Sequence, residues 1–468
     1  MADKNNLEIT APNLQASFAL LSKYRNQTKR LRNGKEEEDE PSQPRRLQMA
    51  EALSAVTIVK MALLYHSTSL NTGDSSNLAK SVGISNESEN HLKHVLRLLD
   101  AAEKLSNQEY DEAEELLLSV LSSGPLPIDR LITCYAGYLR ERIDVKKRRI
   151  DLEREVNHFD LEEAMIDLKA AMFGCEQKFP LLQISNYAAI QTILDSLASA
   201  EKIHLIDIGR KLCSYWIVMM HALANRKNCQ LKQLKITAVC TPMYDVTGRG
   251  ELLSSIAESM NLPFVFKMLY EEEKVLEKVG LECEAGEKVA VYMDHSLHCL
   301  SACPKNVEGL LRGLKRLNPH VMVVIDVEES FPTATFSQRF RGALCISSAV
   351  VDCIERCVQG DRRYTEIIEK VHFEETICNG VMSEDAGGES FSHRRRIDFW
   401  REYFARFGIM EREMSEGAIC QARVMMGERP CWSSCSLSIN GKSIILCWKG
   451  IPLRFVSAWN FHQDNTVS

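Results

Sequence analysis

From residue 203 onward the chain alternates short β-rich runs with amphipathic segments, and this alternation limits the folds it can adopt. Segments such as GELLSSIAESM and VEGLLRGLKRL separate the runs. Strands that alternate with helices at this spacing predict a parallel sheet with right-handed crossovers. The runs cover residues 204–208, 234–240, 264–269, 289–293 and 321–327. We therefore predict an α/β fold with a doubly wound, Rossmann-type core.

The stretch HLIDIGRKLCSYW, residues 204–216, has the strand, acid and turn glycine that open such a core, where ligands often bind. Asp207 and Gly209 are the candidate cofactor-binding residues. A dinucleotide site needs G-x-G-x-x-G after the strand, and a methyltransferase usually has a glycine-rich turn here. Lys211 stands where a further glycine is expected. The pattern favours a turn glycine and a capping acid, with Asp207 accepting backbone N–H bonds at the next helix, over a bound cofactor.

Residues 46–173 carry helical periodicity with no β-rich run, which predicts an all-helical unit with loops at 70–88 and 122–129. Apolar side chains form two stripes at helical spacing. Sustained heptads are absent, so packing within the molecule is favoured over pairing with another chain. The stripes are Leu92, Val95, Leu96, Leu99 and Ala102, and Leu131, Ile132, Tyr135, Leu139 and Ile143.

The first 46 residues combine a basic run, an acidic block at 36–40 and two prolines, which is typical of a disordered, solvated tail. The basic run is either a nuclear import signal or part of a solvated leader. The whole chain has 57 Lys and Arg against 64 Asp and Glu, a net charge of −7, so it has no overall attraction to nucleic acid. The basic residues of the run are Lys23, Arg25, Lys29, Arg30, Arg32 and Lys35.

The C-terminal region predicts antiparallel strands. Asn440-Gly441 is a strong hairpin signal, and Lys449-Gly450 marks a second turn. We expect two or three strands here, added to the edge of the parallel sheet. The tryptophans of this region supply large apolar area and are interpreted as core anchors. They are Trp432, Trp448 and Trp459.

Other clusters of polar residues give weaker signals. The histidine and cysteine spacings are poor for zinc, and the cysteine pairs are isolated in the sequence, so we predict no metal site. No nucleophile elbow, P-loop or HExxH motif occurs, so we also predict no catalytic residue. The arginines at 394–396 are either a phosphate or acidic-partner site or a solvated basic patch. The clusters are His295, His298, Cys299 and Cys303, then Cys353 with Cys357, and Cys431 with Cys435.

Sixteen cysteines without an apolar leader point to free thiols in a reducing compartment, and no apolar stretch reaches the ~18 residues of a membrane span. We therefore expect no membrane association.

The order of several sequence blocks resembles the GRAS family of plant transcriptional regulators, which includes the SCARECROW-like and DELLA proteins. HLIDI resembles the family's VHIID core, FPTATFSQRF its PFYRE region, and LCWKGIPLRFVSAW its closing SAW motif. Ser214 and Tyr215 replace the usual glycine and glutamine before the core tryptophan, which indicates a divergent member. The matching positions are His204, Leu205, Ile206, Asp207, Trp216, Pro332, Phe336, Arg339, Phe340, Trp400, Trp448, Gly450 and Trp459.

The resemblance implies one GRAS domain over residues 47–462 with a helical cap on a methyltransferase-like α/β core and a C-terminal antiparallel hairpin. Its regions are a tail at 1–46, a leucine-rich cap at 47–175, the core with a second leucine-rich region at 176–330, a PFYRE-like region at 331–415 and a SAW-like region at 416–468. We expect no DELLA-type hormone-sensing segment before the domain.

In function, the resemblance implies a non-enzymatic, cofactor-free regulator of transcription, in the nucleus or shared with the cytoplasm. It implies partners among other transcription regulators, homo- or heterodimers with GRAS proteins, and indirect or weak contact with promoter DNA. The alternative is a small-molecule sensor or methyltransferase-like enzyme that uses a cleft beside Asp207 and Gly209.

Overall fold

The computed structural model describes most of the chain from residue 53 to residue 461. The tail at 1–46, with the whole basic run, lies outside the described residues, as do Pro332, Lys211 and the cluster from His295 to Cys303. The described residues are 53–69, 85–120, 124–147, 178–209, 214–227, 229–240, 248–270, 283–294, 297, 304–328, 335–358, 362–380 and 395–461.

In these residues a nine-stranded mixed sheet runs through the core, in the order β3-β2-β1-β4-β5-β9-β8-β7, with β6 paired to β9. The first five strands are parallel, as the alternation predicts. The reversal of strand order at β1 and β4 confirms the doubly wound Rossmann topology. The strands are β1 (Lys202–Gly209), β2 (Gln233–Cys240), β3 (Phe264–Tyr270), β4 (Lys288–Asp294), β5 (Val321–Val327), β6 (Ile409–Arg412), β7 (Cys435–Asn440), β8 (Ser443–Trp448) and β9 (Ile451–Phe461).

The antiparallel strands β7, β8 and β9 extend the parallel sheet beyond β5, as predicted. The short strand β6, which pairs with β9, was not predicted. Lys449 and Gly450 form the turn between β8 and β9 with φ of 47° and 77°, the left-handed pair of a tight hairpin. The other turn is shifted by one residue from the predicted Asn-Gly. Asn440 pairs with Ser443, so Gly441 and Lys442 form the loop, and Gly441 takes the positive φ.

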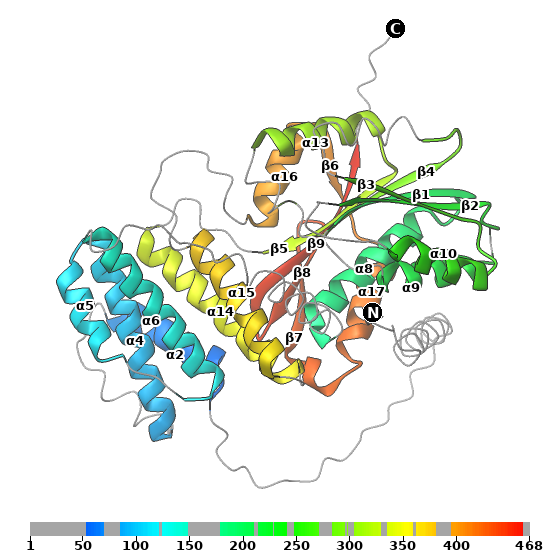
Figure 1. The fold of residues 1–468 in the computed structure, drawn as a ribbon. Helices are drawn as coiled ribbons and strands as arrows, with labels where there is room; N and C mark the ends of the chain where they lie inside the picture. The colour runs from blue at the N-terminus through cyan, green and yellow to red at the C-terminus, as the bar shows by residue number, and fades with distance from the viewer. Residues whose placement is uncertain are drawn as a thin grey trace, which may run out of the picture.

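Helices cover both faces of the sheet (Figure 1). Successive residues of β1 face opposite cores, because side chains alternate along a strand: Leu205 packs toward α8 and α9, and Ile206 toward α13 and α16. One face carries α8 (Pro180–Ser196), α9 (Ser214–Ala224), α10 (Arg249–Ser259), α17 (Glu416–Met426) and the 3₁₀ helix η2 (Pro430–Ser434). The other carries α13 (Pro304–Leu317) and α16 (Ile397–Ala405).

A separate helical core lies beside the sheet. The predicted apolar stripes pack within it, which confirms the interpretation of packing within the molecule. Its N-terminal helices are α2 (Ala55–Ser69), α4 (Asn86–Ser106), α5 (Tyr110–Leu118) and α6 (Pro127–Lys146), so α4 and α6 begin before the ends of the loops predicted at 70–88 and 122–129. Two later helices complete it: α14 (Phe336–Cys357) and α15 (Arg362–Gly380).

Helix α14 joins the two parts of the molecule. Its Phe336 and Phe340 pack in the helical core, where Tyr135 meets the ring of Phe340 edge-on at 5.4 Å. Its later residues Cys353 and Ile354 pack in the core beneath the sheet. The helical cap is therefore fixed to the α/β core by one continuous helix. No helix among the described residues is long and apolar enough to cross a membrane.

Candidate functional site

The candidate site is the carboxyl edge of the parallel strands at the point where the strand order reverses. In doubly wound folds this is where ligands bind, because the loops after the two central strands separate there. Here those strands are β1 and β4, and Gly209 at the end of β1 lies in register with Asp294 at the end of β4. The sequence predicted Asp207 and Gly209 at this edge and missed Asp294.

The Asp207 carboxylate binds a side chain in the first turn of α9. Its Oδ2 accepts a hydrogen bond of 2.8 Å from the indole Nε1 of Trp216, and both residues are buried. The Trp216 ring in turn meets Tyr292 edge-on, with centroids 4.8 Å apart. We expected Asp207 to accept backbone N–H bonds at this helix, and the described partner is an indole. The bond fixes α9 against β1, which is a positioning role.

Asp294 belongs to a second set of buried contacts at the same edge. Arg454, on the antiparallel strand β9, donates from Nη2 to Asp294 Oδ1 at 2.7 Å, and both side chains are buried. The Tyr292 hydroxyl lies 3.4 Å from Asp294 Oδ2 and also donates to Asn186 Oδ1 on α8. The acid at the end of β4 is thus neutralised by a cation from the C-terminal strand.

The position of the Asp207 carboxylate explains why residue 209 is a glycine. A Cβ at this position would lie 2.9 Å from Asp207 Oδ1, and 3.9 Å from the backbone of Asp294. The missing side chain makes room for the Asp207 carboxylate, so its presence needs no phosphate to explain it. The described polar side chains at this edge bind one another, which is the arrangement of a structural hub.

We predict that Trp216→Phe lowers the free energy of unfolding by about 1–3 kcal/mol, because it leaves a buried acceptor of Asp207 without its donor. The phenyl ring retains an aromatic contact with Tyr292. Chemical denaturation followed by far-ultraviolet circular dichroism measures the change.

Trp432→Phe is the matched control, since within the described structure its buried Nε1 has no hydrogen-bond partner. The substitution makes the same change in volume without removing a hydrogen bond. Equal losses of stability in the two variants would contradict a specific role for the Asp207–Trp216 bond.

Apart from Gly450 in the exposed β8–β9 turn, the other described family-motif residues are dispersed through the cores. Trp448 donates from Nε1 to Asp352 Oδ2 at 2.7 Å and so ties β8 to α14. Trp400 packs with Phe404 on α16, whose ring meets Trp459 edge-on at 4.8 Å. The prediction that the C-terminal tryptophans are core anchors is confirmed, because Trp432, Trp448 and Trp459 are all buried. His204, Leu205, Ile206, Phe336, Arg339 and Phe340 are also buried.

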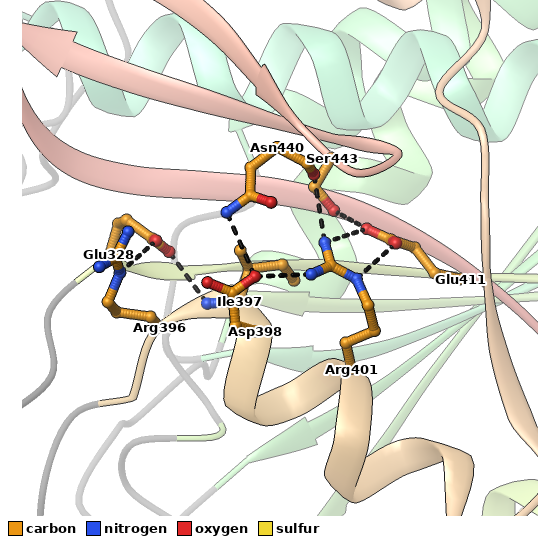
Figure 2. A network of polar contacts seen from close by, with 8 residues as sticks. All are labelled: Glu328, Arg396, Ile397, Asp398, Arg401, Glu411, Asn440 and Ser443. Carbon is orange, nitrogen blue, oxygen red and sulfur yellow. Dashed lines mark hydrogen bonds and ion pairs between the residues drawn. The ribbon is translucent and has the colours of Figure 1, made fainter. Parts of the chain in front are cut away.

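Figure 2 shows a polar network that joins the end of β5 to α16, β6 and the β7–β8 turn. Glu328 accepts from Arg396 Nε at 3.0 Å and from the backbone N–H of Ile397 at 3.0 Å. Arg401 donates to Glu411 at 2.8 Å and to Asp398 at 2.6 Å. Asn440 and Ser443 of the hairpin also donate to these two acids.

This network bears on the arginines at 394–396, two of which lie in the described residues. Arg396 is bound to Glu328, and the Arg395 guanidinium lies 4.8 Å from the centroid of the Phe399 ring. Both side chains therefore make contacts within the chain, while the Arg396 side chain stays 52% exposed. The two sequence interpretations of this segment stay predictions.

Glu328 gives a prediction for the pH dependence of stability. Burial raises its pKa, against the opposing effects of the Ile397 N–H and Arg396. A carboxyl whose folded pKa is raised stabilises the fold below its unfolded pKa of about 4.3, and loses that contribution as pH rises through the folded pKa.

We therefore expect wild type to lose stability relative to Glu328→Gln as pH rises above about 4. Denaturation of both proteins across this range gives the difference at each pH. A difference that stays constant, or that favours wild type more as pH rises, would contradict the assignment.

The two cysteine pairs that are isolated in the sequence meet in the structure. Cys357 donates from Sγ to the Cys431 carbonyl oxygen at 3.6 Å, which joins the end of α14 to η2. A hydrogen bond with the Cys353 thiol lowers the pKa of Cys357, whereas burial raises the pKa of Cys435. Local spacing could not reveal this contact, since 74 residues separate Cys357 from Cys431.

The model of the GRAS domain family matches residues 94–460. DELLA protein GAI1 from Vitis vinifera is 24% identical over 392 residues, covering 81% of this chain and 64% of that protein. Protein SCARECROW from Arabidopsis thaliana is 26% identical over 371 residues, covering 78% of this chain and 55% of that protein.

A shorter relative is covered more fully: Scarecrow-like protein 23 from Arabidopsis thaliana is 26% identical over 379 residues, covering 79% of this chain and 89% of that protein. The chain spans 51–64% of the lengths of three DELLA relatives. Among solved structures, the crystal structure of SCL7 in Oryza sativa has a TM-score of 0.65 at 21% identity, covering 78% of this chain and 99% of that one. That likeness shows the fold.

Proposed function

The chain belongs to the GRAS domain family, and from this premise we propose that it is a nuclear regulator of transcription that acts mainly through contacts with DNA-binding partners. The proposal is supported by the family match over residues 94–460 and by relatives named DELLA and SCARECROW proteins. The net charge of −7 fits action through partners better than a strong, direct hold on DNA. A cytoplasmic pool is compatible with this role.

The observation that carries the proposal is the family match, to a core in which the two described acids at the carboxyl edge each bind another side chain. Asp207 binds Trp216 and Asp294 binds Arg454. This supports a regulator over the alternative of a small-molecule sensor or methyltransferase-like enzyme. Calorimetric titration with S-adenosylmethionine separates them: we expect no heat of binding and no thermal shift, and a saturable signal would support the enzyme.

Chromatin profiling of a tagged protein, with partner pull-down from the same nuclei, tests the regulatory role. We expect enrichment at promoters that depends on a co-purifying DNA-binding protein. Exclusively cytosolic protein without promoter enrichment would overturn the proposal.

We propose other transcription regulators as partners, including GRAS proteins in homo- or heterodimers. Light scattering during size-exclusion chromatography of the purified chain tests the homodimer. A monomer at all concentrations leaves heterodimers, which co-expression with a second GRAS protein then tests.

We predict that the basic run is a nuclear import signal. Replacing its six lysines and arginines by glutamine should shift the protein toward the cytoplasm, because import receptors recognise such clusters by charge. Quantitative imaging of the tagged variant measures the nuclear fraction. Replacing the acidic block at 36–40 by glutamine is the control, and an unchanged nuclear fraction in the basic-run variant would contradict the prediction.

A further inference from the structure

A cluster of three metal-type donors lies at the opposite, amino-terminal end of the parallel sheet. In the described residues, the ligand atoms of His204, Cys283 and Glu287 lie within 4.8 Å of one another. His204 Nδ1 is 3.6 Å from Cys283 Sγ and 3.4 Å from Glu287 Oε2. His204 is the third residue of β1, and Glu287 directly precedes β4. We predicted no metal site from the spacing of other histidines and cysteines, and that prediction did not consider these three residues, which are far apart along the chain.

The two distances match the edges of a zinc coordination sphere. Zinc binds nitrogen and oxygen at about 2.0–2.1 Å and thiolate at about 2.3 Å in tetrahedral geometry. Those bond lengths place a nitrogen and a sulfur ligand about 3.6 Å apart, and a nitrogen and an oxygen ligand about 3.3 Å apart. The distances from His204 to Cys283 and from His204 to Glu287 are therefore those expected between ligands of one ion.

The second ring nitrogen of His204, Nε2, makes the kind of hydrogen bond that metal-bound histidines make. This nitrogen lies 2.8 Å from Thr237 Oγ1 on the neighbouring strand, and both side chains are fully buried. When Nε2–H donates to this hydroxyl, Nδ1 presents its lone pair to Cys283 and Glu287. Metal-bound histidines usually donate their other N–H to an oxygen in this way, which fixes the tautomer and the ring.

Glu287 is also held in place. Its carboxylate accepts from the backbone N–H of Glu284 at 2.9 Å and from Lys235 Nζ at 3.0 Å and 3.2 Å. Ligating carboxylates are commonly hydrogen-bonded in turn. Lys235 is also the competing explanation, because Lys235 and Glu287 form a buried ion pair that satisfies the carboxylate without a metal.

We propose that His204 Nδ1, Cys283 Sγ and a Glu287 carboxylate oxygen bind a zinc ion, with water as the fourth ligand. Mixed nitrogen, sulfur and oxygen donors suit zinc among the common biological cations. Binding transfers the thiol proton of Cys283 to solvent. The thiolate and carboxylate then carry two negative charges, which face the ion and the Lys235 ammonium together. The half-buried Cys283 gives access from the surface.

The ion would have a structural role. It joins β1 to the turn that enters β4, at the end of the sheet away from Asp207 and Asp294. It is independent of the proposed regulatory function, and its test requires no partner or DNA.

The experiment uses the full chain, reduced and stripped of metal, titrated with cobalt(II) as a spectroscopic substitute for zinc. We expect a thiolate-to-cobalt charge-transfer band that saturates at one equivalent and disappears when zinc is added. Cys283→Ser should abolish the band, whereas Cys229→Ser, also at a half-buried cysteine, should leave it unchanged. Circular dichroism checks that each variant is folded.

Thr237→Val tests the support of the histidine. Loss of an outer-shell partner typically weakens metal binding about 10- to 100-fold, and we expect a loss of this size in a competition assay with a zinc chelator. No band in wild type would overturn the proposal and favour the Lys235–Glu287 pair alone. A band that persists in Cys283→Ser would also overturn it, and would assign the metal to other thiols such as those near η2.

Discussion

Arg454→Met is expected to lower the free energy of unfolding by about 3–5 kcal/mol, because it leaves the Asp294 carboxylate buried without its cation. The pair joins the end of β4 to β9 with an N–O distance of 2.7 Å, and Asp294 is fully buried. Removing one partner of a buried pair costs more than the pair itself contributes, since the remaining charge loses both water and its counterion. Guanidinium denaturation monitored by circular dichroism measures the loss.

Two further variants separate the ion pair from ordinary packing. The double variant Asp294→Asn with Arg454→Met should recover part of the loss, because no buried charge is left unpaired. Arg312→Met removes an arginine whose pair with Glu308 lies on the exposed side of α13, and should cost no more than about 1 kcal/mol. A double variant less stable than Arg454→Met would contradict the argument.

This pair marks the limit of what the sequence can predict. The five parallel strands were predictable because each carries its own local pattern of apolar residues between amphipathic segments. The contact between Arg454 on β9 and Asp294 on β4 joins residues that are 160 positions apart in the sequence. Nothing local to either residue specifies it. The same holds for α14, whose pattern predicts a helix without indicating that Phe336 and Phe340 complete the cap.

In the candidate site, too, residues close in sequence were predictable and contacts between distant residues were not. Asp207, Gly209 and Trp216 lie in one strand-turn-helix segment, so the sequence could bring them together. Asp294 was missed, although an acid at the end of a predicted strand was a usable signal. The donors at the amino-terminal edge were missed for a different reason. His204 stands within a strand pattern that the apolar sequence explains, and Cys283 and Glu287 approach it only because β4 pairs with β1.

Trp459→Ala should lower the free energy of unfolding by about 3–5 kcal/mol, through lost burial and the cavity left behind. Trp459 is fully buried on β9, where it lies in register with Met322 of β5 and Glu411 of β6. Its ring meets Phe404 edge-on at 4.8 Å, and its Nε1 donates to Ser457 Oγ at 2.9 Å. One side chain thus holds the antiparallel extension, the parallel sheet and α16 together. Denaturation curves of the two proteins give the difference.

Met410→Ala is the control on the adjoining strand β6, since Met410 is 51% exposed and should change stability by no more than about 0.5 kcal/mol. Trp459→Phe, which keeps most of the ring, should fall between the two. If the C-terminal strands were an appendage on a self-sufficient parallel sheet, Trp459→Ala would melt them alone and leave a second, unshifted transition. We expect one transition shifted as a whole, because β9 lies inside the sheet between β5 and β8.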